Sequence, residues 1–192
     1  MFPTSQLKSS GILYSNPAET SASIKREITP TQIEEARSSG CLHVKDCDIE
    51  YLPQLPCEIT SVTIENCNNL TNLTGLPVNT QNLSVINCEK LQITDMPSTV
   101  KNLHIELTDS PFIHIIPEGI ECLTVCRCHI SGVPESVRYL EIKGSATDSI
   151  KNVPNGLSSL SINSYNPENQ ARIDNLISPS LQTLSLTGCS NI

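Results

Sequence analysis

The sequence predicts an α/β repeat solenoid, a horseshoe in which short parallel strands lie side by side along a concave sheet. Three observations predict this fold. A short apolar strand pattern returns about every 20 residues, a proline stands six residues before most copies, and a cysteine follows many of them by five residues. Aromatic residues make up 3% of the chain and Trp is absent. The core must therefore consist of Leu, Ile and Val, which suits stacked repeats.

The first segment, residues 1–28, is rich in Ser and Thr and shows little periodicity. Such a composition is typical of a disordered segment. It is interpreted either as a flexible tail or as an uncleaved export signal. The apolar run at Gly11–Tyr14 is too short to be the core of a cleavable secretory signal.

A short capping helix is expected over residues 29–40. Either Thr29 caps it with Pro30 at the first helical position, or Thr31 and Glu34 form a capping box. Because so short a helix is marginal alone, we expect it to cover the open end of the first repeat.

Residues 41–192 are predicted to form about eight short leucine-rich repeats. Each repeat has an aliphatic anchor and a second aliphatic residue two positions later, which is the alternation of a strand with one buried face. The spacing fits the leucine-rich-repeat pattern. It leaves too few residues for a full helix on the return path, so the convex side should be mostly extended. The anchors are Leu42, Val62, Leu83, Leu103, Leu123, Leu140, Leu160 and Leu184.

A ladder position lies five residues after each anchor, and its side chain is expected to turn inward. A small side chain with a weak donor suits this position, so we interpret the cysteines there as structural. Neighbouring ladder residues are ~5 Å apart, a distance that permits a disulfide, although we expect free thiols. The ladder residues are Cys47, Cys67, Cys88, Thr108, Cys128, Ser145, Tyr165 and Cys189.

A second group of cysteines, Cys122, Cys126 and Cys128 with His129, has the composition of a metal site. Cys122 and Cys126 are expected on the sheet surface, ~13 Å apart along one strand. Zinc holds its sulfur ligands at ~2.3 Å, and Cys128 is assigned inward. We therefore predict no metal and no cofactor.

The interval after Leu160 is longer than the others, at 24 residues. Asn166, Pro167 and Glu168 could cap and start a helix, so a short helix is predicted over about 167–176. The alternative is an insertion in a tolerant loop.

No catalytic constellation is found in the sequence. The histidines lack a framed nucleophile, and there is neither a Gly-rich phosphate loop nor a paired-carboxylate signature. The net charge of −8 disfavours nucleic acid as a partner, and no apolar run is long enough to span a membrane. The chain is therefore interpreted as non-enzymatic.

What remains for function is the concave face, made by residues one before, one after and three after each anchor. Solenoids commonly bind partners on this face, although a single residue there can also be merely solvated. Because binding hot spots favour Tyr, the centre is predicted at Tyr139 with His104, Glu106 and Glu141. The candidate partner-binding residues are His43, Lys45, Thr63, Glu65, His104, Glu106, Thr124, Tyr139, Glu141 and Lys143.

The repeat, together with the doubled Leu52-Pro53-Gln54-Leu55-Pro56, resembles the bacterial LPX subfamily of leucine-rich repeats. That subfamily is known from type III secreted effectors of the YopM and IpaH kind. The resemblance covers residues ~30 to 192. It implies a chain secreted into a host cell, where its repeats bind a host protein in the cytoplasm; otherwise a cytoplasmic protein is expected.

This chain departs from the subfamily pattern in three respects. Cys replaces the usual Asn at the ladder, the Leu-Pro dipeptide is degenerate, and the sequence stops at Ile192 without a ligase domain. Two hypotheses stand: a self-contained binding module, or the substrate-recognition part of an IpaH-like ubiquitin ligase. An amoebal or viral repeat protein is a further alternative. The uncovered last repeat predicts truncation, a missing partner or end-to-end self-association.

Overall fold

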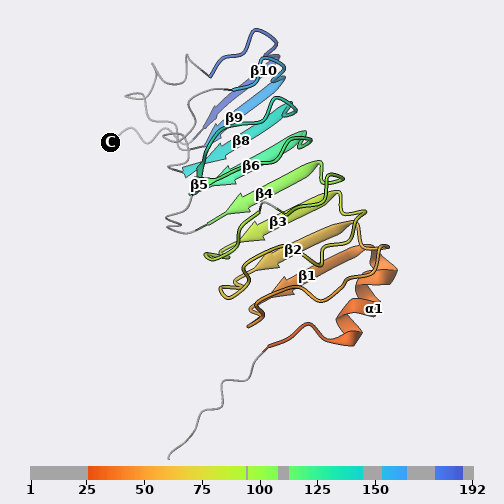
Figure 1. Cartoon of the computed structure of the whole chain (residues 1–192). Helices are drawn as coiled ribbons and strands as arrows, with labels where there is room; N and C mark the ends of the chain where they lie inside the picture. The colour runs from red at the N-terminus through yellow and green to blue at the C-terminus, as the bar shows by residue number, and fades with distance from the viewer. Residues whose placement is uncertain (1–25, 94, 108–112, 145–152, 164–175, 188–192) are drawn as a thin grey trace, which may run out of the picture.

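The computed structural model describes residues 26–93, 95–107, 113–144, 153–163 and 176–187. Its main element is an eight-stranded parallel sheet in the order β1-β2-β3-β4-β6-β8-β9-β10 (Figure 1). The strands of this sheet are β1 (Cys41–Lys45), β2 (Ser61–Glu65), β3 (Asn82–Ile86), β4 (Asn102–Glu106), β6 (Cys122–Cys126), β8 (Tyr139–Lys143), β9 (Ser159–Asn163) and β10 (Thr183–Thr187). Two further short strands, β5 (Ile113–His114) and β7 (His129–Ile130), form a separate parallel pair.

The register of the main sheet places every predicted anchor beside the next. Leu83 pairs with Val62 on one side and Leu103 on the other, and Leu123 continues the row. Anchor side chains from β1 to β9 are buried, as are the aliphatic residues two positions later. Stacking is what buries them, because a single short strand cannot cover its own apolar face. The predicted repeat solenoid with a parallel sheet is confirmed.

The capping helix is α1 (Pro30–Ser39). Thr29 is its N-cap and forms a capping box with Gln32, so the predicted box between Thr31 and Glu34 is wrong. Thr31 lies inside the helix and cannot be its cap. The helix ends at Gly40, whose φ of 74° suits a residue without a β-carbon. As expected, α1 contacts β1 at one end of the sheet (Figure 1).

The return paths consist of turns and extended segments, as predicted for the convex side. Several recurring prolines begin a turn, since their carbonyl oxygens accept a hydrogen bond from the amide three residues on, at 3.1 Å for Pro97, Pro134 and Pro154. Beyond α1, the described return segments contain no α-helix. Within the described ranges, no helix has the length and apolarity that crossing a bilayer requires.

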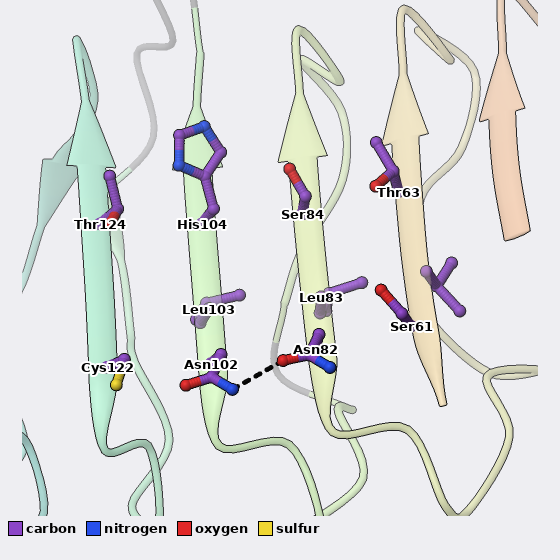
Figure 2. A pocket seen from close by; sticks show the side chains of 11 residues that line it. Ser61, Thr63, Asn82, Leu83, Ser84, Asn102, Leu103, His104, Cys122 and Thr124 are labelled. Atoms are coloured by element: carbon purple, nitrogen blue, oxygen red, sulfur yellow. Dashed lines mark hydrogen bonds between the residues drawn. The ribbon is translucent and has the colours of Figure 1, made fainter. Parts of the chain in front are cut away.

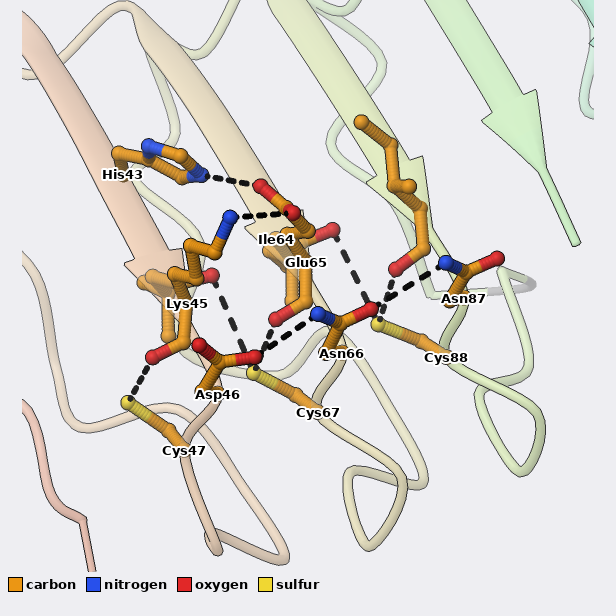
Figure 3. Close-up of polar contacts among 12 residues, drawn as sticks. His43, Lys45, Asp46, Cys47, Ile64, Glu65, Asn66, Cys67, Asn87 and Cys88 are labelled. Carbon is orange, nitrogen blue, oxygen red and sulfur yellow. Dashed lines mark hydrogen bonds and ion pairs between the residues drawn. The ribbon is translucent and has the colours of Figure 1, made fainter.

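The ladder cysteines within the described residues, Cys47, Cys67, Cys88 and Cys128, turn inward, as predicted. Cys67 is fully buried, and its Sγ donates to the Glu65 carbonyl at 3.4 Å; Cys88 repeats this contact with Ile86 at 3.3 Å (Figure 3). Burial raises the pKa of the Cys128 thiol to about 11. The eight cysteines within the described residues are all free.

Several predictions fall outside the described ranges. The ladder residues Thr108, Ser145, Tyr165 and Cys189 lie there. So does the helix predicted over 167–176, apart from Leu176, which is buried at a turn.

Two burial predictions are wrong. Leu184 was assigned to the core but is 43% exposed, because β10 has a neighbouring strand on one side only in the described part of the chain. Cys126 was assigned to the surface but is buried. It lies in register between the long side chains of Glu106 and Lys143, and the neighbouring Arg127 side chain reaches across to Glu106.

Candidate functional site: the concave sheet face

The candidate site is the sheet face opposite the return paths, which we call the concave face. All ten predicted partner-binding residues lie on strands of the main sheet and belong to this face. The alternation of β-strands explains the placement, because residues flanking a buried anchor must point to the other side. They are His43 and Lys45 on β1, Thr63 and Glu65 on β2, His104 and Glu106 on β4, Thr124 on β6, and Tyr139, Glu141 and Lys143 on β8.

The first polar cluster on the concave face joins β1 and β2. The Glu65 carboxylate accepts from Lys45 Nζ at 2.6 Å and lies 3.0 Å from His43 Nε2 (Figure 3). The hydrogen bond from Lys45 is the main reason that the pKa of Glu65 is lowered from its usual value. The acid is thus already neutralised by a neighbour within the chain.

The second cluster joins β4 to the residue after β6. Arg127 Nη2 lies 2.6 Å from Glu106 Oε1, and His104 Nε2 lies 3.7 Å from Glu106 Oε2. Sequence reasoning missed Arg127, which follows the strand in a left-handed conformation with φ of 50°. The signal was available, because Arg127 stands four residues after the anchor Leu123, at the end of the strand.

The third cluster surrounds Glu141 on β8. Its carboxylate lies 3.1 Å from Lys143 Nζ and accepts hydrogen bonds from Thr124 at 3.4 Å and Asn163 at 3.3 Å. Nearby Tyr139 is 56% exposed. The predicted centre is therefore divided between two clusters, because His104 and Glu141 lie on strands separated by β6.

Between the first and third clusters lies a shallow hollow of about 200 Å³, which we call the central basin. At one end Asn102 Nδ2 donates to Asn82 Oδ1 at 2.6 Å (Figure 2). The surface that the basin exposes is mostly apolar, with hydroxyl and amide groups set into it. Its lining residues are Ser61, Val62, Thr63, Asn82, Leu83, Ser84, Asn102, Leu103, His104, Cys122 and Thr124. Strand alternation predicts Asn82 and Asn102 on this face, but neither is among the ten predicted site residues.

A column of polar side chains was also missed at the end of the first strands. Asn66 Nδ2 donates to Asp46 Oδ1 at 2.8 Å, and Asn87 Nδ2 donates to Asn66 Oδ1 at 3.2 Å (Figure 3). All three residues have φ between 51° and 54°, a conformation that Asn and Asp tolerate better than most residues. The Asp or Asn directly before Cys47, Cys67 and Cys88, the first three ladder cysteines, was the signal for this column.

The concave face carries hydrogen-bonding groups and paired charges. In the described part of the chain, no group of three or more His, Cys, Asp or Glu residues is placed to hold a metal ion. The face offers amide and hydroxyl groups at its centre and paired charges around them. Such groups can hydrogen-bond a ligand that lies across the strands.

The fold and this face define a repeat solenoid with one broad sheet surface. Comparison with models of known protein families, with curated proteins and with solved structures finds no match for the chain.

Proposed function

We propose that the chain is a recognition module that binds a partner protein through the concave face. The observation that carries the proposal is the pairing of the charges there. Glu65, Glu106 and Glu141 each have a cationic partner within the chain, whereas the lining of the central basin contains no Asp, Glu, Lys or Arg and exposes mostly apolar surface between a few amides and hydroxyls. Protein interfaces likewise have few charged residues at their core and a polar rim.

Tyr139 is the proposed anchor for the partner. Its ring is 56% exposed beside Glu141, and exposed Tyr residues are frequent binding hot spots. A nucleic acid is a poor partner, since the chain has a net charge of −8 and would repel phosphates.

We further propose that the chain is a secreted bacterial effector that binds a host protein, acting by occupancy and without catalysis. This rests on the resemblance of the repeat to the LPX subfamily and on the Ser/Thr composition of residues 1–28. Deleting residues 1–28 from a reporter fusion should abolish delivery into host cells. A ubiquitin-transfer assay on the purified chain tests the non-catalytic part, and autoubiquitination would contradict it.

Partner capture in host cells tests the binding proposal. The variant Tyr139→Ala with Glu141→Lys changes the anchor and the third cluster of the concave face. The matched control is Tyr51→Ala with Glu50→Lys, which makes the same changes at exposed residues outside the sheet. We expect the concave variant to lose partners that the wild type and the control retain. If both variants keep every partner, the concave face is not the binding surface.

A further inference from the structure

In the described part of the chain, strand β10 leaves an apolar surface open at one end of the main sheet. Its anchor Leu184 is 43% exposed, whereas Leu160, its neighbour in register on β9, is fully buried. At the opposite end Leu42 of β1 is only 4% exposed, because α1 covers it (Figure 1). The two ends of the sheet therefore differ: among the described residues, α1 covers β1 and no element covers β10.

The backbone of β10 is also open on this side. The amide of Thr183 donates to the Ser158 carbonyl at 3.1 Å, so Thr183 directs its backbone groups toward β9. Alternate residues of a strand direct their N–H and C=O groups to opposite neighbours. Leu184 and Leu186 therefore direct theirs to the edge that has no partner strand among the described residues.

Unprotected edges of this kind are pairing surfaces. Natural edge strands are usually protected by Lys, Pro or a bulge, and β1 carries Lys45 at the other end of the sheet. The sequence of β10, Thr-Leu-Ser-Leu-Thr, has no charge and no proline. It also reads identically in both directions.

We propose that β10 pairs antiparallel with β10 of a second copy of this chain, about a two-fold axis at Ser185. The palindrome then places Leu184 opposite the partner's Leu186 and Thr183 opposite the partner's Thr187. Directly opposite residues of an antiparallel pair lie on the same face. The leucines of both copies thus form one continuous apolar layer, and the hydroxyl residues share the other face.

The backbone alternation supports the same register. Leu184 and the partner's Leu186 both direct their backbone groups to the shared edge, so they exchange both N–H···O bonds. Ser185 meets the partner's Ser185 as a pair without hydrogen bonds, where Cα atoms approach to ~4.5 Å. If the pairing register shifted by one residue, Leu184 would lie opposite a residue whose backbone N–H and C=O groups are already directed to β9. That residue could not bond the partner strand.

The opposite end of the sheet favours a closed dimer over a chain of copies. Joining β10 to β1 of another copy would place its apolar layer against α1, which already covers Leu42. Pairing β10 with itself uses the same surface on both copies and closes the assembly.

A charge introduced at Ser185, which lies on the proposed two-fold axis, tests the proposal. Sedimentation across a concentration series should give the wild type twice its chain mass of 20.9 kDa. Ser185→Lys and Ser185→Glu should each weaken self-association about 10-fold or more, because like charges then face each other. An equimolar mixture of the two variants should regain the dimer, which also shows that both are folded.

The matched control is Ser161→Lys, which adds the same charge on the same face one strand away, at the residue in register with Ser185. It should leave the dimer intact. A wild type that is monomeric throughout the series overturns the proposal. So does a mixture that stays monomeric, or a control as disruptive as Ser185→Lys. The measurement needs no partner protein, so its outcome is independent of the proposed function.

Discussion

Gly75 lies so close to Leu52 that a β-carbon on Gly75 would sit 2.6 Å from the Leu52 carbonyl oxygen, with Gly75 at φ of +135°. Successive return paths therefore meet backbone to backbone at this point. An L-residue with a side chain would meet both the contact and an unfavourable φ.

Gly75→Ala should lower the free energy of unfolding by more than about 2 kcal/mol. Urea denaturation measures this change. Gly132→Ala is the control, because a β-carbon there has no atom within 4 Å, and it should leave stability unchanged or raise it by up to about 1 kcal/mol. Equal urea midpoints for Gly75→Ala and Gly132→Ala would show that the close approach of Gly75 to Leu52 does not affect stability.

The ladder thiols should be protected from alkylation in the native state. Cys41 and Cys57 are exposed, whereas Cys67 and Cys88 are buried. Thiol labelling requires access, so maleimide should modify the exposed pair rapidly and the buried pair only after unfolding. Peptide mass spectrometry reads each site, and Cys41→Ser with Cys57→Ser should remove the rapid labelling of that pair. Native labelling of Cys67 at the rate of Cys41 would contradict the ladder assignment.

Stability should fall in alkaline solution. Burial raises the pKa of Cys128 from 9.0 to about 11, so the unfolded chain loses this proton at a lower pH than the folded chain. The stabilisation is complete below pH 9.0 and is lost as pH rises through about 11, at about 1.4 kcal/mol per pH unit in between.

Unfolding free energies measured across that alkaline range check the prediction for Cys128. Cys128→Ala should make the decline with pH shallower, whatever its effect on stability at neutral pH. An unchanged slope in this variant would assign the alkaline decline to other groups.

Glu65 should titrate below its usual value of 4.5, chiefly because Lys45 donates a hydrogen bond to it. A lowered pKa stabilises the fold above the usual value, and this contribution is lost as pH falls through the folded pKa. Carboxyl NMR measures the titration. Lys45→Met should raise the pKa of Glu65. Lys143→Met, in the third cluster, should leave that pKa unchanged. A pKa of Glu65 that does not respond to Lys45→Met would contradict the contact between Lys45 and Glu65.

Much of the fold follows from the sequence because it depends on local spacing. The interval between anchors predicted the register of Leu83, Leu103 and Leu123, and strand alternation predicted which face each neighbour takes. Helix capping was predicted only as two alternatives. Choosing Thr29 over Thr31 as the N-cap required knowing that the helix begins at Pro30.

The candidate site was less predictable. The sequence placed Glu106 on the concave face, but its partner Arg127 lies 21 residues away and after the strand end. A pairing of this kind depends on how two long side chains lie across adjacent strands. The burial of Cys126 beneath that pair was missed for the same reason.

By itself, the sequence determined the solenoid, the buried and exposed faces of its strands and the inward cysteine ladder, since each depends on the repeat period alone. Only the tertiary structure decided which charges pair on the concave face, why Gly75 must be glycine and that Leu184 is exposed. Those features depend on distances between separate repeats and on whether a strand has a neighbour on both sides, which no spacing within one repeat encodes.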